Sequence, residues 1–257
     1  MRRRPCLRST LQFLVLATAL PAPVVGAETL TVSVASSFKD VGAELATAFE
    51  AEHAGVTVQL NNGPSGMLAR QIEDGAPVDV FVSAGWPEVE RLRGKDLVAG
   101  EPVVVARNRL VLVVPAGSSW IGKEPRALLT SNEVTRIASG DPATVPFGAY
   151  AKQALEESGL WSTVQPKLVF ASEVRQALTY AEQKAVDASI VYATDARIVK
   201  NATLLGEVPG AEGLRIEAVA VRTRHATGEV ADQFLAHLRS ERARKALVAA
   251  GFGLPGS

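Results

Sequence analysis

The chain has 257 residues, of which 47% are hydrophobic, and its 27 basic side chains balance 27 acidic ones. This length allows a sizeable apolar core, so the fold does not need disulfides. Cys6 is the single cysteine and stands near the N-terminus, which excludes thiol catalysis and cysteine-based metal sites from the rest of the chain.

The first 27 residues have the pattern of a secretory signal. Four arginines within the first eight residues precede the apolar run Leu11–Leu20, and Val25-Gly26-Ala27 offers small residues for cleavage. The apolar run is too short to span a bilayer. We therefore predict export to the periplasm with cleavage after Ala27. Because Cys6 precedes the apolar run, it is not placed to become a lipidated N-terminus, and we expect no lipid anchor.

Removal of this signal changes the charge balance. It takes away four arginines and leaves 23 basic side chains against 27 acidic ones, a net charge of −4. A nucleic-acid partner requires a concentrated basic face, so this composition argues against one. No later segment is long and apolar enough to cross a membrane, and we expect a soluble exported protein.

Apolar segments of strand and helix character alternate from Thr29 onward, which predicts an α/β fold with a largely parallel sheet. The first expected elements, alternately strand and helix, are Leu30–Val34, Val41–Phe49, Val56–Leu60, a helix from Ser65, Val78–Ser83 and a helix from Trp86.

A second unit of the same kind interrupts the first. Two apolar strands, Arg109–Pro115 and Ile216–Arg222, flank about a hundred residues that have their own alternating pattern. A domain interrupted in this way has two lobes, and we place the limits at residues 28–108 and 218–257 for lobe 1 and 109–217 for lobe 2. Ligands of open α/β sheets bind beyond the carboxyl ends of the strands, which here predicts a site between the lobes.

The stretch Val32–Asp40 has the form of a strand, a small-residue turn and the start of a helix. Ser37 stands where a helix N-cap is expected, with Asp40 three residues later as in a capping box. The same junction directs a hydroxyl and free backbone N–H groups toward one point, where an anion can bind. Both interpretations of Ser37, helix cap and anion ligand, are open on this stretch alone.

Three further junctions repeat the arrangement. Ser65-Gly66 belongs to the first lobe, and Pro146–Tyr150 and Ser172–Arg175 belong to the second. Tyr192 ends an apolar strand and adds a phenolic donor. Neutral donors without a carboxylate suit a fully ionised oxyanion, whereas a monoprotonated phosphate benefits from an acceptor for its proton. The pattern therefore favours an anion clamp between the lobes.

These residues resemble the periplasmic molybdate-binding proteins of ABC transporters over nearly all of the mature chain. The resemblance implies the two-lobed periplasmic-binding-protein fold, each lobe a mostly parallel sheet flanked by helices, joined by two crossover strands. Its most specific segments are Ala35-Ser36-Ser37, Leu68–Ile72 with Gly75–Asp79, Gly140-Asp141-Pro142 with Val145-Pro146, Glu173-Val174-Arg175 and Ile190-Val191-Tyr192.

In that family two serines and a tyrosine hold the oxyanion through their side chains, with help from backbone N–H groups. The matching side chains here are Ser37, Ser65 and Tyr192, and the matching backbone donors are Phe147 and Val174. The family often has a small residue where this chain has Phe147, and the larger side chain alters cleft closure or ligand size.

The resemblance implies a binding protein, not an enzyme, that needs no cofactor. It would capture molybdate, with tungstate as a second ligand, and deliver it as a monomer to a membrane permease with a cytoplasmic ATPase. The same fold with another ligand, such as sulfate or a small organic anion, is the alternative.

Two enzyme-like motifs give weaker hypotheses. Ser36–Lys39 matches the S-x-x-K of extracytoplasmic serine hydrolases, but the S-D-N and K-T-G elements of that class are missing from the sequence. Gly117–Lys123 has the spacing of a nucleotide-binding P-loop, but Glu124 stands where a magnesium-binding serine or threonine is required. We expect the second motif to be a surface loop.

Overall fold

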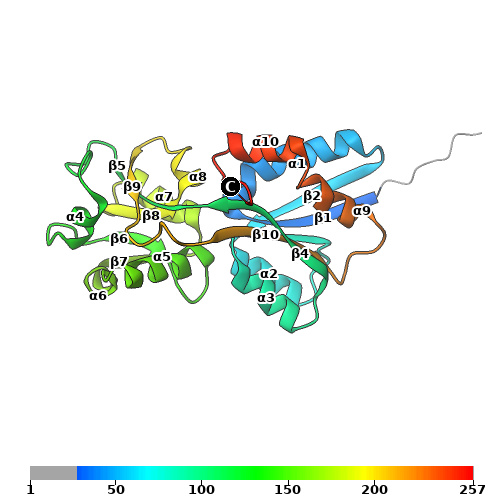
Figure 1. The fold of residues 1–257 in the computed structure, drawn as a ribbon, viewed down its shortest axis with the longest axis horizontal. Coiled ribbons are helices and arrows are strands. Elements are labelled where there is room, and N and C mark those ends of the chain that lie inside the picture. The colour runs from blue at the N-terminus through cyan, green and yellow to red at the C-terminus, as the bar shows by residue number, and fades with distance from the viewer. Residues whose placement is uncertain (1–27, 257) are drawn as a thin grey trace, which may run out of the picture.

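The computed structural model describes residues 28–256, and the predicted signal peptide with its cleavage site lies outside them. Two lobes stand side by side, each a sheet covered by helices on both faces (Figure 1). Within the described part of the chain, no helix has the length and apolar character required to cross a bilayer.

Lobe 1 contains a five-stranded sheet in the order β2-β1-β3-β10-β4. Its strands are β1 (Glu28–Ala35), β2 (Val56–Gly63), β3 (Val80–Ser83), β4 (Val98–Asn108) and β10 (Ile216–Thr223). Its helices are η1 (Ser36–Phe38), α1 (Lys39–Glu52), α2 (Ser65–Glu73), α3 (Trp86–Gly94), α9 (Val230–His237) and α10 (Glu241–Ala249).

Lobe 2 contains a five-stranded sheet in the order β7-β6-β8-β5-β9. Its strands are β5 (Leu110–Pro115), β6 (Ile137–Gly140), β7 (Leu168–Ala171), β8 (Ala188–Tyr192) and β9 (Ala202–Glu207). Its helices are α4 (Pro125–Thr130), α5 (Pro146–Glu157), α6 (Trp161–Val164), η2 (Gln165–Lys167), α7 (Val174–Glu182) and α8 (Ala193–Ala196).

The expected α/β class is confirmed, but both sheets are mixed and not largely parallel. In lobe 1, β1 pairs in parallel with β2 and β3, while β10 runs antiparallel to β3 and β4. In lobe 2, β6 pairs in parallel with β7 and β8, while β5 runs antiparallel to β8 and β9. Within each lobe, the strand at the first crossing pairs with the strand at the second: β4 leaves lobe 1 beside β10, which enters it, and β5 enters lobe 2 beside β9, which leaves it. These two pairs are antiparallel because one strand leaves the lobe where the other enters it.

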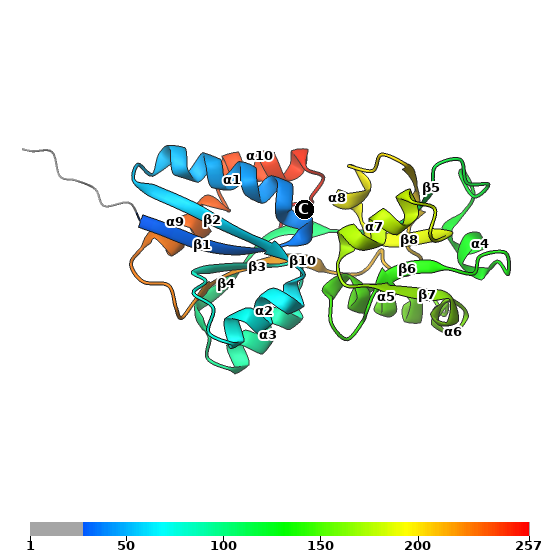
Figure 2. The same cartoon turned by 180° about the vertical axis from the view of Figure 1, so that it is seen from behind.

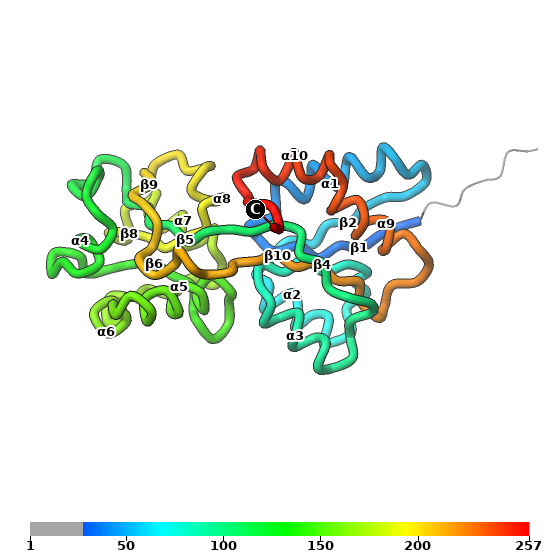
Figure 3. The backbone as a smooth tube through the Cα atoms, viewed as in Figure 1, coloured from blue at the N-terminus to red at the C-terminus, as the bar shows by residue number. Residues whose placement is uncertain are grey.

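The chain passes between the lobes twice. The first crossing lies between Asn108, the end of β4, and Leu110, the start of β5. The second lies between Glu207, the end of β9, and Ile216, the start of β10. The two connecting segments run beside each other in the middle of the molecule (Figure 3). The lobe limit at 109 falls inside the first connection, whereas the limit at 217 falls at the second residue of β10, and both limits stay a prediction.

Strand β3 shows why the sheet of lobe 1 has a core on each face. Val80 and Val82 pack with β1, α1 and α9, whereas Phe81 between them packs with α2 and α3 on the opposite face. Side chains of a strand alternate between faces, so the continuous apolar run fits a strand that is buried on both. The cores bring α1 and α2 against the sheet with their first turns at the carboxyl ends of β1 and β2.

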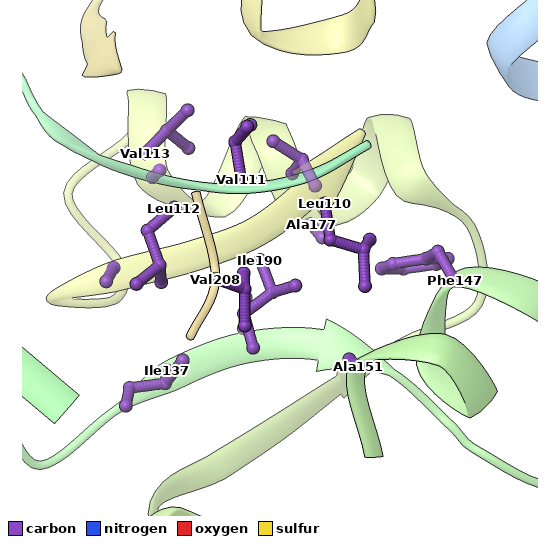
Figure 4. Packing of buried hydrophobic residues seen from close by; sticks show 14 of the residues in the cluster. Leu110, Val111, Leu112, Val113, Ile137, Phe147, Ala151, Ala177, Ile190 and Val208 are labelled. Atoms are coloured by element: carbon purple, nitrogen blue, oxygen red, sulfur yellow. The ribbon is translucent and has the colours of Figure 1, made fainter. Parts of the chain in front are cut away.

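The core of lobe 2 places two of the predicted site residues. Leu110 and Leu112 of β5 and Ile190 of β8 are fully buried in one cluster that also contains Phe147 (Figure 4). Tyr192 belongs to the same cluster. The ring centroids of Phe147 and Tyr192 are 6.1 Å apart. Both rings are therefore fixed by core packing at the edge that faces lobe 1.

Strands β4 and β9 were not among the expected elements. Gly100 and Pro102 interrupt the apolar pattern of β4, and its ladder with β10 contains register shifts. Strand β9 lies at a sheet edge and exposes 53% of Leu204, so it lacks the continuous apolar run of a central strand. Neither strand therefore has an apolar sequence pattern regular enough to predict it.

Candidate functional site

A small cavity lies between the lobes, where strand ends of lobe 1 face strand ends of lobe 2. Helices α1 and α7 begin near this junction of the lobes, on the same side of the two sheets (Figure 2). All five residues predicted to hold the oxyanion line the cavity. The complete lining is Ala35, Ser36, Ser37, Pro64, Ser65, Ala84, Val145, Pro146, Phe147, Glu173, Val174 and Tyr192.

Ser37 lies in the short helix η1 between β1 and α1, and it is not the N-cap of α1. The N-cap position belongs to Phe38, and no side chain caps this helix. The Ser37 hydroxyl is buried, and it finds no hydrogen-bond partner in the described structure. The 3₁₀ turn moves the N-cap of α1 one residue along the chain, from Ser37 to Phe38, and Ser37 instead lines the cavity. Since a buried hydroxyl without a partner costs free energy, it indicates a place prepared for a ligand.

Ser65 opens helix α2 immediately after the end of β2, as the sequence predicts. Its hydroxyl oxygen accepts a hydrogen bond from the backbone N–H of Ala84 at 3.1 Å. That bond fixes the side chain and leaves its proton available for donation into the cavity.

Phe147 and Val174 stand in the first turns of α5 and α7, where backbone N–H groups lack intrahelical acceptors. Helix α5 reaches the cavity because it packs very closely against the end of β6. A Cβ atom on Gly148 would lie 2.4 Å from the carbonyl oxygen of Gly140, so this approach requires glycine. Two helix N-termini from lobe 2 thus direct partial positive charge at the cavity.

Tyr192 ends strand β8, and only 2% of it is exposed. Its hydroxyl also has no hydrogen-bond partner in the described part of the chain. Burial raises the pKa of Tyr192 well above its ordinary value, with further contributions from Tyr150, Glu88 and Asp195. The phenol is therefore protonated and can act as a donor.

The electrostatics of the cavity come from dipoles rather than cations. No lysine or arginine is among its lining residues. One carboxylate is present, contrary to the expectation of a site with donors alone. The Oε2 atom of Glu173 accepts a hydrogen bond from the Ser36 hydroxyl at 2.6 Å. This bond to a protein donor partly stabilises the negative charge of the carboxylate. Sequence reasoning placed Glu173 and Ser36 in the right segments but assigned neither a role.

The lobes touch beside the cavity. A Cβ atom on Gly66 of α2 would lie 2.2 Å from the carbonyl oxygen of Thr144 in lobe 2. On Gly85, a Cβ atom would lie 3.1 Å from Cβ of Pro146 and 3.2 Å from the Tyr150 hydroxyl. The two lobes are therefore in backbone contact at these glycines, and the structure has the closed arrangement.

Glu88 of α3 is a buried carboxylate. It is 7% exposed, and its Oε2 atom lacks a hydrogen-bond partner among the described residues. Burial raises its pKa above 4.5, while Arg91 on the same helix and the Ser83 hydroxyl oppose the shift. Glu88 interacts electrostatically with Tyr150 of lobe 2, so this carboxylate lies near the interface between the lobes.

The two enzyme-like motifs do not form catalytic sites. The hydroxyl of Ser36 bonds to Glu173, and Lys39 points to solvent at the start of α1, so the serine lacks its base. Gly117–Lys123 forms turns between β5 and α4 and is not part of the cavity lining. The described residues contain no group of three His, Cys, Asp or Glu side chains that could hold a metal ion.

Residues 30–253 match the family model described as bacterial extracellular solute-binding protein. The chain belongs to this family. It is 32% identical to molybdate-binding protein ModA of Haemophilus influenzae over 227 residues, which cover 87% of this chain and 89% of that protein. It is 34% identical to the putative ABC transporter substrate-binding lipoprotein YvgL of Bacillus subtilis, with 87% and 86% covered.

A solved structure supports the same assignment. The periplasmic molybdate-binding protein of Azotobacter vinelandii matches with a TM-score of 0.76 and 27% identity over 88% of this chain and 99% of that one. The resemblance to molybdate-binding proteins and the two-lobed fold are thus confirmed. As an extracellular solute-binding protein of the ABC transporter type, the chain acts outside the cytoplasm as a transport component and not as an enzyme.

Proposed function

We propose that this solute-binding protein captures molybdate, with tungstate as a second ligand, in the cavity between its lobes. The observation that carries the proposal is the pair of buried hydroxyls without partners, Ser37 from lobe 1 and Tyr192 from lobe 2, which line one cavity. A tetrahedral dianion satisfies both, together with Ser65 and the N–H groups of Phe147 and Val174. The molybdate-binding relatives support this choice of ligand.

In the proposed mechanism, molybdate enters between separated lobes and the lobes then close around it. Hinge closure buries the dianion among donors supplied by both lobes, so neither lobe alone provides the full set. Molybdate undergoes no reaction. The closed protein presents its outer surface to the permease of an ABC importer, which is driven by a cytoplasmic ATPase.

We propose that the exported protein is a monomer without a lipid anchor. The only cysteine stands before the apolar run of the signal, so cleavage after Ala27 removes it. The Bacillus subtilis relative is described as a lipoprotein. Mass spectrometry of the exported protein tests this point: an unmodified N-terminus at Glu28 agrees with the proposal, and a lipid-modified mass contradicts it.

Isothermal titration of the mature protein with molybdate, tungstate, sulfate and phosphate tests the ligand assignment. We expect molybdate and tungstate to bind one-to-one, sulfate to bind much more weakly because the smaller ion leaves donors unsatisfied, and phosphate not to bind near neutral pH. Tight binding of sulfate with no heat from molybdate would retain the fold and replace the ligand. The absence of heat from every oxyanion would overturn the proposal.

Binding should weaken as the pH rises, because Glu88 is buried near the interface between the lobes. The pKa of Glu88 is raised in the closed structure. We expect it to lie closer to its ordinary value when the lobes are apart, so that closure takes up a proton. Protonated Glu88 favours closure of the lobes, and its contribution to the free energy of closure is lost as the pH rises through the raised pKa. Titrations at increasing pH above the ordinary glutamate pKa should show a falling affinity in the parent and a flatter profile in Glu88→Gln. Identical profiles would contradict this role.

A further inference from the structure

A hydrogen bond joins the two lobes directly beside the cavity. The hydroxyl of Ser36, at the end of β1, donates to Oε2 of Glu173, at the start of α7, over 2.6 Å. Ser36 is buried and Glu173 is half-buried. The donor belongs to lobe 1 and the acceptor to lobe 2, so the bond exists only when the lobes are closed.

An ion pair crosses between the lobes next to this bond. The Nη2 atom of Arg175, in the first turn of α7, lies 2.8 Å from Oδ2 of Asp40, in the first turn of α1. The Nε atom of the same guanidinium lies 2.6 Å from Oδ1 of Asp195, a fully buried carboxylate of lobe 2. Asp195 therefore anchors Arg175 within its own lobe and directs the remaining N–H groups at lobe 1.

The order of these residues along the chain couples them to the ligand donors. Ser36 precedes Ser37, whose hydroxyl faces the cavity, and Glu173 precedes Val174, whose backbone N–H is a candidate donor. A bond between Ser36 and Glu173 thus holds two donor segments from opposite lobes at a fixed separation. Neither Ser36 nor Glu173 is needed as a ligand for this effect.

We propose that Ser36, Glu173, Asp40 and Arg175 form an interlobe clasp that positions the oxyanion donors and sets how long the ligand stays bound, an inference that rests on the proposed function. The ligand enters before the clasp forms, so the clasp does not contribute to the association step. Release requires the clasp to break. The clasp therefore lowers the dissociation rate and leaves the association rate unchanged.

Stopped-flow fluorescence of the full mature protein with molybdate separates the two rates, with the intrinsic tryptophans as the signal. Ser36→Ala removes the hydroxyl but keeps the carboxylate. We expect it to raise the dissociation rate by about tenfold or more, the size expected for a hydrogen bond to a charged group, with an association rate like that of the parent. Glu173→Ala should have a similar effect, because it removes the same bond.

A double-mutant cycle distinguishes the clasp from separate contacts of each residue with the ligand. If the two side chains act on each other, the variant with both substitutions should dissociate no faster than the quicker single variant. Multiplied effects in the double variant, or a change confined to the association rate, would overturn the inference. Failure of the parent to bind molybdate would instead overturn the proposed function.

The ion pair has a closely matched control inside lobe 1. Arg222 and Asp232 lie 2.8 Å apart, with exposures of 24% and 56%, against 25% and 67% for Arg175 and Asp40. Asp40→Asn should speed dissociation by a few-fold at low salt and by less at high salt, because this exposed pair is screened. Asp232→Asn should leave both rates unchanged. Equal effects of the two substitutions would remove Asp40 and Arg175 from the clasp.

Discussion

Gly66→Ala is expected to abolish tight molybdate binding while leaving both lobes folded. The added methyl group would lie 2.2 Å from the carbonyl oxygen of Thr144 across the interface, a contact that backbone atoms cannot relieve by rotation. The closed form should be disfavoured by about 3 kcal/mol or more, which corresponds to at least a hundredfold loss of affinity. With the lobes apart, the same methyl group faces the open space between them.

The fold itself should not suffer from this substitution. Gly66 lies within helix α2 and has no positive φ, so alanine fits its backbone and removes flexibility from the unfolded chain. Thermal unfolding without ligand should occur at the parent temperature or slightly above it. Gly42→Ala in helix α1 is the control, because its methyl group meets only Val34 side-chain atoms at 3.8 Å or more. If Gly66→Ala binds molybdate like the parent, closure at this contact is not required.

Tyr192→Phe should weaken molybdate binding by about 1.5–3 kcal/mol, the amount typical of a hydrogen bond to a charged group. The hydroxyl is buried without a partner in the described structure, and burial keeps it protonated. Removal of this hydroxyl therefore breaks no hydrogen bond within the ligand-free protein, and it eliminates a buried polar group that lacks a partner. Stability without ligand should be unchanged or higher, so binding and stability should move in opposite directions.

Tyr180→Phe provides the matched control for this experiment. Tyr180 lies on α7, packs against the same core from outside the cavity, and keeps its hydroxyl away from the proposed ligand. Both variants should be measured by titration with molybdate and by thermal unfolding. A Tyr192→Phe variant with parental affinity would remove the tyrosine from the site, and a marked loss of stability would assign its hydroxyl a structural role instead.

The sequence predicts much of this site because its residues follow strands with strong apolar patterns. Ser37, Ser65 and Tyr192 each stand at or just beyond the end of a predicted strand, and such ends meet at the ligand-binding edge of an α/β sheet. The resemblance to molybdate-binding proteins then indicates that these hydroxyls are ligand donors and not ordinary helix caps. For Ser37 the cap interpretation was wrong, since a short 3₁₀ turn intervenes before α1.

Features that depend on how the lobes meet could not be predicted from local patterns. The bond between Ser36 and Glu173 arises only when residues far apart in the chain come together on closure. His237 is a similar case inside one lobe, because it is buried against Phe49 and its Nδ1 atom lies 3.3 Å from Oε2 of Glu52. Periodicity reports which face of an element is apolar, not which polar residues a second element covers.

Crystals of the mature protein grown with molybdate offer the most direct test, because molybdenum can be located by its anomalous scattering. We predict one strong anomalous peak in the cavity between the lobes, within hydrogen-bonding reach of the hydroxyls of Ser37, Ser65 and Tyr192. Its oxygens should accept from the backbone N–H groups of Phe147 and Val174. A peak elsewhere, or an empty cavity in a protein that binds molybdate in solution, would contradict the proposed site.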